Sequence, residues 1–221
     1  GLVVIDEVQR VPELFQSLNP VAYSGSMDEQ RKAPDPRAAA VPQMDALARP
    51  IAHRTEVLVL QHPQEQRQPK NSVTLLRLSL VHCDVVVGEQ FDPGALQALL
   101  YRPGRDTRLL YPDVPAAPAP EAPEIMAGAP LRLVVLDATW RKSLRMLLEH
   151  PALAALPRLQ LDAPAPTRYR AIRAARRADQ VSTLEATVQA LAMLEGSSFD
   201  GAPLLDAFSC FVADIAARQR P

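Results

Sequence analysis

The side chains best suited to take part in a reaction are those of Asp137, Thr139 and Trp140, which stand together directly after an apolar run. The run, Leu131–Leu136, is rich in valine and leucine and predicts a buried strand of an α/β sheet. A carboxylate at the carboxyl end of such a strand lies where open α/β sheets bind their ligands. Asp137 is therefore a candidate catalytic carboxylate, and the only tryptophan of the chain follows it three positions later.

The same residues also allow a purely structural interpretation. Arg141–His150 carries leucines and a methionine among basic residues, which predicts an amphipathic helix. Asp137 or Thr139 would then cap this helix, and Trp140 would fill the core. The spacing alone leaves both interpretations open.

Other polar residues stand at the ends of predicted elements. Gly88 and Glu89 end a strand, where a backbone can approach a ligand closely. Ser182 and Glu185 have the spacing of a capping box, and the start of the helix that they cap also offers free N–H groups to a ligand. Between these segments, arginines with an interleaved tyrosine suit phosphate contact and base stacking, namely Arg168, Tyr169, Arg170 and Arg173.

The elements that must position these residues alternate between strands and helices. We expect strands at Glu56–Leu60, Asp84–Val87, Thr107–Tyr111, Leu131–Leu136 and Leu159–Leu161. We expect helices at Lys70–Leu80, Pro93–Leu100, from about Trp140, at Ser182–Leu194 and at Pro203–Arg218. This alternation predicts an α/β fold with a mainly parallel sheet and helices on both faces.

Composition narrows the classes of protein. The net charge is −1, but Leu131–Gln180 holds ten lysines and arginines against four acidic residues, which indicates either a phosphate-binding face or a solvated helix surface. No apolar run reaches the length of a membrane span, so we expect no membrane partner. Cys83 and Cys210 lie in apolar settings that indicate buried free thiols in a reducing compartment, and we therefore expect a cytoplasmic protein.

Residues 1–48 differ from the rest and are predicted to be an atypical N-terminal segment and linker, left by a fusion or a mis-called gene start. An apolar run that ends in Asp6-Glu7 resembles the second phosphate-site segment of P-loop ATPases. The chain has no Gly-x-x-x-x-Gly-Lys-Ser/Thr loop, so we do not expect an ATPase. Residues 49–221 are predicted to form the catalytic domain.

The motif Asp137-x-Thr139-Trp140 after a hydrophobic strand resembles the DTW-domain family of tRNA-uridine aminocarboxypropyltransferases. The resemblance runs from about Arg49 to about Ala213. Its other motifs follow in the expected order, namely Thr55–Pro63 with Glu65, Lys70-Asn71-Ser72, Leu75–Leu80, Gly88-Glu89, Arg168-Tyr169-Arg170, Ile172-Arg173 and Ser182–Ala186.

The resemblance implies a fold and a reaction. The fold is a SPOUT-like sheet whose C-terminal part forms a trefoil knot that holds S-adenosylmethionine. The reaction is the transfer of the 3-amino-3-carboxypropyl group of S-adenosylmethionine to N3 of a uridine in tRNA. Two alternatives stay open, an RNA methyltransferase on the same fold and an RNA-binding relic without catalysis.

The resemblance also implies roles for single residues. Asp137 would be the base, in a dry pocket that raises its pKa, with Thr139 and Trp140 beside it. The cofactor would contact Gly88, Glu89, Ser182, Thr183 and Glu185. The tRNA would contact His62, Lys70, Asn71, Arg168, Tyr169, Arg170 and Arg173. The alternative for the arginines is that one of them instead binds the carboxylate of S-adenosylmethionine with two hydrogen bonds. Many family members carry a zinc-binding cysteine cluster, whereas Met44–Pro50 here has no cysteine, so we expect no metal.

Overall fold

The computed structural model describes residues 44–68, 72–121, 124–125, 128, 130–161 and 182–218. Within these residues, five strands form one sheet in the order β2-β1-β4-β3-β5, and every pairing is parallel. The strands are β1 (Glu56–Gln61), β2 (Cys83–Val87), β3 (Asp106–Leu110), β4 (Leu131–Asp137) and β5 (Arg158–Leu159). All five were expected from the sequence, to within two residues at each end, and the parallel sheet is confirmed.

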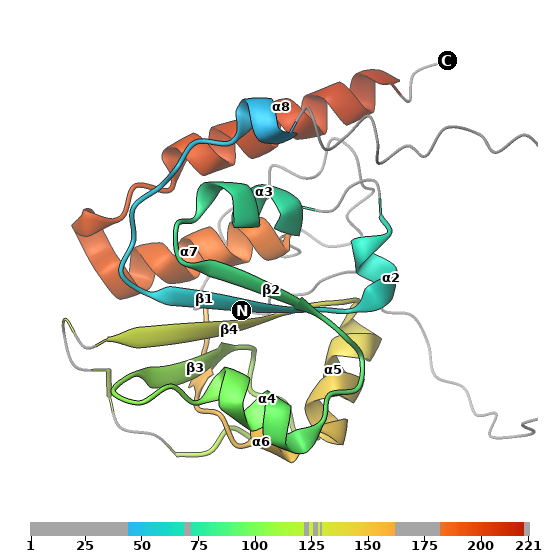
Figure 1. Ribbon diagram of the computed structural model, residues 1–221, viewed down its shortest axis with the longest axis vertical. Helices are drawn as coiled ribbons and strands as arrows, with labels where there is room; N and C mark the ends of the chain where they lie inside the picture. Colours follow the sequence, from blue (N-terminus) through green and yellow to red (C-terminus); the bar gives the residue numbers. More distant parts are fainter. Residues whose placement is uncertain are drawn as a thin grey trace, which may run out of the picture.

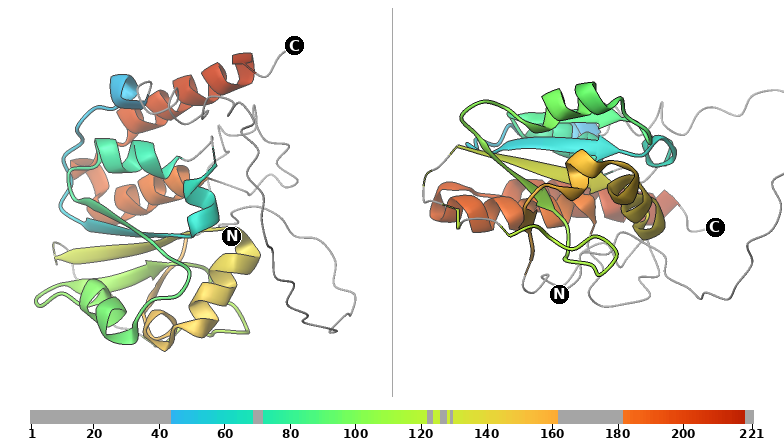
Figure 2. Two further views of the ribbon diagram at one scale, coloured as in Figure 1. Left: turned by 45° about the vertical axis from the view of Figure 1, so that its right-hand side comes forward. Right: turned by 90° about the horizontal axis from the view of Figure 1, so that it is seen from below.

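Helices cover both faces of the sheet, as predicted (Figure 1). One face carries α3 (Val73–Ser79), α7 (Thr183–Glu195) and α8 (Ala202–Arg218), and the other carries α4 (Pro93–Leu100), α5 (Trp140–Glu149) and α6 (Pro151–Ala154). Figure 2 shows the same two layers from other sides. The short helices α2 (Pro63–Gln66) and α6 and the 3-10 turn η2 (Gly196–Ser198) were not predicted, because three or four residues give no hydrophobic period.

The strand β4 is the centre of the fold. It lies between β1 and β3, and all seven of its residues are buried. Its side chains alternate between two cores, so that Val135 packs in the cluster that includes residues of α7 and α8, while Leu136 packs in the cluster that includes residues of α4 and α5. Burial of a Val or Leu side chain contributes about 1.5–3 kcal/mol to the free energy of folding. The buried side chains of β4 therefore hold the residue at its end in a fixed position.

One residue of β4 departs from the apolar pattern. Arg132 is almost fully buried, and its Nη1 lies 2.5 Å from Oε2 of Glu56, its register partner on β1. Arg105 contacts the other oxygen of Glu56 at 3.0 Å. A buried guanidinium needs such a partner, because desolvation of an unpaired charge is costly.

The expectation of two buried thiols is wrong for Cys210, which is exposed on α8, while Cys83 on β2 is partly buried. Both thiols are free, and burial raises the pKa of Cys83 to about 12, so this thiol stays protonated.

The helices in the described part of the chain are too short or too polar to cross a membrane. Residues 44–47 form a helical turn whose Met44 packs in the core, and the division of the chain at residue 49 stays a prediction.

Candidate active site

The ends of β1 and β4 meet at the point where the chain changes direction across the sheet. From β1 the chain continues to β2 on one side, whereas from β4 it continues to β5 on the other side. Such a switch point opens a crevice at the carboxyl ends of the two strands, and open α/β sheets bind ligands there. Gln61 ends β1 and Asp137 ends β4, and the two residues are paired in register.

Asp137 is buried at this point and is held by its neighbours. Gln61 Nε2 donates to Oδ2 at 2.8 Å, and Thr183 Oγ1 donates to Oδ1 at 2.6 Å. The main-chain oxygen of Asp137 accepts the N–H of His62 at 2.9 Å, which ties the ends of the two strands together. Donors on both carboxylate oxygens stabilise the negative charge of this group.

The capping interpretation of Asp137 and Thr139 finds little support. Thr139 is the N-cap residue of α5 by position, but its side chain makes no capping hydrogen bond. The side chain of Asp137 contacts β1 and α7 through Gln61 and Thr183. The carboxylate therefore links three elements across the edge of the sheet.

The capping box that the sequence predicts at α7 is confirmed. Ser182 Oγ accepts the N–H of Glu185 at 3.1 Å, and Glu185 Oε2 accepts the N–H of Ser182 at 2.9 Å. These two side chains satisfy donors that a helix start leaves open. Their bonds fix the first turn of α7, where Thr183 contacts Asp137.

His62 and Glu89 lie beside this centre. His62 Nδ1 accepts the N–H of Gln64 at 3.1 Å, so in the neutral ring the proton is on Nε2, which faces Glu89 Oε2 at 3.4 Å. Gly88 donates its N–H to the main chain of β1, and a Cβ added there would stand 2.6 Å from the ring of Phe91. A side chain at this position would therefore displace that ring, which explains the glycine.

Trp140 packs against a second aromatic ring. It stacks on Tyr111 with ring centroids 5.5 Å apart and an interplanar angle of 5°. Ser143 Oγ donates to the carbonyl of Trp140, so the Tyr111 hydroxyl donates to Ser143 Oγ, at 3.1 Å. Burial raises the pKa of Tyr111 to about 12, which keeps the phenol neutral. These residues, with Thr183 and Ala186, line a cavity of about 20 Å³, room for about one water.

Three residues of this site were not predicted from the sequence: Gln61, Tyr111 and Ser143. Gln61 ends β1 and Tyr111 directly follows β3, so both stand at the same edge of the sheet as Asp137. A search for polar residues at the carboxyl ends of all predicted strands would have found them. Several predicted site residues lie outside the described part of the chain, namely Lys70, Asn71, Arg168, Tyr169, Arg170 and Arg173.

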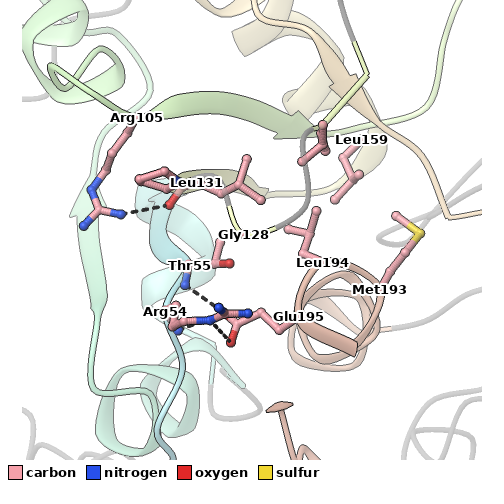
Figure 3. Close-up of a pocket in the computed structure, with 11 residues that line it drawn as sticks. Arg54, Thr55, Arg105, Gly128, Leu131, Leu159, Met193, Leu194 and Glu195 are labelled. Carbon is pink, nitrogen blue, oxygen red and sulfur yellow. Dashed lines mark hydrogen bonds and ion pairs between the residues drawn. The ribbon is translucent and has the colours of Figure 1, made fainter. Parts of the chain in front are cut away.

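A larger cavity, of about 550 Å³, lies near the amino ends of β1 and β4, away from Asp137 (Figure 3). Glu195 is buried there and accepts the N–H groups of Arg54 at 2.9 Å and Thr55 at 2.7 Å. Burial alone would raise the pKa of Glu195, but these hydrogen bonds outweigh it and lower the pKa. Arg105 Nη1 donates to the carbonyl of Leu131 at 3.4 Å (Figure 3).

Among the described residues, His, Cys, Asp and Glu side chains do not gather in groups of three or more that would hold an ion.

Comparison with known proteins identifies relatives of the chain. The family described as DTW domain matches residues 40–216. A tRNA-uridine aminocarboxypropyltransferase 2 of Drosophila melanogaster is 32% identical over 152 residues, which are 66% of this chain and 59% of the relative. A tRNA-uridine aminocarboxypropyltransferase 2 of Macaca fascicularis is 27% identical over 158 residues, 69% of this chain and 52% of the relative.

A plant relative gives a shorter match. The tRNA-uridine aminocarboxypropyltransferase A of Arabidopsis thaliana is 29% identical over 110 residues, 44% of this chain and 42% of the relative. The chain thus spans about half the length of the curated relatives that it matches. No solved structure matches it significantly.

Proposed function

Because the chain belongs to the DTW-domain family, we propose that it transfers the 3-amino-3-carboxypropyl group of S-adenosylmethionine to N3 of a uridine in tRNA. The observation that carries this proposal is the position of Asp137. Its carboxylate is buried at the switch point of the sheet and bonded to Gln61 and Thr183. A fixed carboxylate at a ligand-binding edge is what the removal of a proton from a pyrimidine requires.

In the proposed reaction, Asp137 takes the proton from uracil N3. The new bond forms between N3 and the carbon of the aminocarboxypropyl group that is bonded to sulfur. S-adenosylmethionine supplies this carbon next to a sulfonium, so the electron pair of the broken C–S bond goes to sulfur and methylthioadenosine leaves. The task of the protein is to hold N3 in line with that carbon rather than with the methyl group.

The residues beside Asp137 fit the chemistry of an adenosine ligand. Tyr111 and Trp140 offer aromatic surface for stacking, and Ala186 adds a small apolar wall. The cavity between them, about 20 Å³, is far smaller than adenine, so binding requires these walls to part. We assign Thr183 to this wall, and Ser182 and Glu185 support it through the helix cap. Gly88 and Glu89 stay predictions as cofactor contacts.

The proposed RNA partner would approach the same edge of the sheet. Helix α5 begins at Trp140 and carries Arg141, Lys142 and Arg145, whose side chains suit phosphate groups. Lys142 contacts Glu65 at 3.7 Å and Arg145 contacts Glu89 at 3.5 Å, so a phosphate would compete with these carboxylates. His62 is held next to this helix start, because Lys142 Nζ contacts Gln64 of α2 at 2.5 Å. The role of His62 in binding the uridine, like that of the arginines of residues 168–173, is part of the proposal.

We also propose that the sheet is SPOUT-like and that its C-terminal part forms a trefoil knot. The parallel sheet with β4 between β1 and β3 supports a fold of this general kind. A crystal structure that traces residues 162–181 would test the knot, since the path of this segment decides whether the chain passes through a loop.

The decisive experiment incubates the protein with S-adenosylmethionine and unmodified tRNA, followed by mass spectrometry of the nucleosides. A uridine that gains the mass of an aminocarboxypropyl group supports the proposal. A gain of only a methyl group would instead identify a methyltransferase. Binding of tRNA and S-adenosylmethionine without any modified uridine would identify an RNA-binding relic.

A further inference from the structure

Gln61 has no assigned role, yet its side chain contacts the proposed base. It is the last residue of β1 and is buried, and its amide Nε2 lies 2.8 Å from Asp137 Oδ2. The main chain of Gln61 is fixed as well, because β1 pairs with β4 and its last carbonyl accepts the N–H of Gly88 at 3.0 Å. The main chain therefore holds the Gln61 amide in a fixed position next to the Asp137 carboxylate.

The second oxygen of Asp137 is held from another element. Thr183 Oγ1 on α7 donates to Oδ1 at 2.6 Å. The terminal torsion of an aspartate is soft, so a carboxylate with a donor on one oxygen only can turn. Donors from a strand and from a helix, one on each oxygen, fix the plane of the carboxylate.

We propose that Gln61 is a positioning residue, whose amide holds the Asp137 carboxylate in the orientation that accepts the uracil proton. This inference rests on the proposed function of Asp137 as the base. An amide suits the role because it donates a hydrogen bond at every pH and cannot ionise. A misplaced reactive group costs up to about 100-fold in rate, which sets the size of the expected effect.

The first test removes the amide with Gln61→Leu, a change of similar size. Turnover of tRNA is expected to fall about 10- to 100-fold, while the Kd for S-adenosylmethionine and the KM for tRNA change less than about threefold. An unchanged kcat overturns the proposal. Equal losses in kcat and in cofactor binding also overturn it, because they would indicate general damage to the pocket.

The second test, Gln61→Glu, gives a signature that a merely structural role would not produce. When the introduced carboxyl is protonated, its O–H donates to Asp137 as the amide does. When both groups are ionised they repel each other, because two carboxylates at this distance share one proton. Activity of Gln61→Glu is therefore expected to approach that of the wild type at acidic pH. It should fall about tenfold per pH unit above the second ionisation of the pair. A pH profile parallel to that of the wild type contradicts the proposal.

A matched control removes a buried hydroxyl of the same helix that donates to the main chain. Thr187 Oγ1 donates to the carbonyl of Thr183 at 2.7 Å, and Thr187→Val is expected to keep kcat within about twofold. Thr183→Val should reproduce the loss seen in Gln61→Leu, and Thr183→Ser, which keeps the hydroxyl, should restore most of the activity. A Thr183→Ser variant as inactive as Thr183→Val counts against the donor role.

Carboxyl-carbon NMR of Asp137 separates failure of this inference from failure of the proposed function. The signal is assigned by its absence from Asp137→Asn. Loss of a donor to the charged form shifts the titration midpoint of this signal to higher pH in Gln61→Leu. If the midpoint shifts but the wild type forms no modified uridine, the proposed function is refuted, while the hydrogen bond between Gln61 and Asp137 is supported. An unshifted midpoint would refute the role of Gln61 whether or not the wild type is active.

Discussion

The hydroxyl of Thr183 lies 2.6 Å from the carboxylate of Asp137, although 46 positions separate the two residues in the chain. Thr183 begins α7 and Asp137 ends β4, so this hydrogen bond joins the start of a helix to the central strand of the sheet. The capping box of Ser182 and Glu185 fixes the same helical turn. The helix cap and the proposed base are therefore parts of one structural unit.

Asp137→Asn keeps the size of the side chain and removes its charge. Turnover of tRNA is expected to fall at least about 100-fold, because general base catalysis contributes about 10²–10⁴ in rate. Binding of S-adenosylmethionine, measured by calorimetry, should change less than about threefold, since this change removes an interaction of the transition state. Activity near that of the wild type would exclude Asp137 as the base.

Trp140 is the only tryptophan of the chain, so its fluorescence reports on the site directly. Its ring stacks on Tyr111, and the cavity beside it is too small for adenine. We expect S-adenosylmethionine to change the emission of Trp140 in a saturable way, because the stacked walls must part. Tyr111→Phe, which keeps the ring, should preserve this change. A constant emission, with binding shown independently by calorimetry, would place the ligand elsewhere.

Ser182→Ala removes the cap of α7. A lost N-cap costs about 1 kcal/mol of unfolding free energy, and turnover should also fall because the turn that carries Thr183 loosens. Asp92→Ala is the matched control, since Asp92 caps α4 through the N–H of Ala95 at 2.9 Å. The two variants should lose similar stability in urea, but only Ser182→Ala should lose activity. If the two variants have equal activity, the cap of α7 does not contribute to catalysis.

His53 makes folding stability depend on pH. Burial, the largest cause, lowers its pKa, and His53 Nε2 accepts the N–H of His82 at 3.1 Å while Nδ1 contacts the carbonyl of Thr55 at 2.7 Å. This arrangement requires the neutral ring. A group with a lowered pKa in the folded state stabilises the protein above its unfolded value, about 6.5 for histidine, and loses this contribution as the pH falls.

We therefore expect the unfolding free energy to decrease as the pH falls below about 6.5, and this decrease to be smaller in His53→Gln. Urea unfolding at several pH values measures both slopes. Identical slopes in the two proteins would show that His53 does not contribute to the acid sensitivity.

Most of the fold could be predicted from the sequence, because its elements have strong patterns. The apolar run of β4 and the valines of β2 indicate strands, and Pro93 marks the start of α4 at the predicted residue. The helix α3 begins at Val73 rather than at Lys70, since hydrophobic spacing shows a helix more clearly than it shows its first turn.

The site could be predicted only in part. Asp137 was found because a polar residue after an apolar strand is visible in the chain itself. Its partners Gln61 and Thr183 come from other elements, and only the order of strands in the sheet brings them together. The stacking of Tyr111 on Trp140 is likewise set by the pairing of β3 with β4, for which the sequence carries no local signal.

The burial of β4 sets the order in which the site would come apart. Asp137 and Gln61 end the two strands in the middle of the sheet, whose amide hydrogens are expected to exchange last. Thr183 belongs to a helical turn that is held by the local hydrogen bonds of its capping box rather than by the ladder of the sheet, and such local units open at lower free energy than the core strands. In rising denaturant, the hydroxyl would leave the carboxylate while the sheet is still intact. Catalysis would then stop in a molecule that spectroscopy still reports as folded.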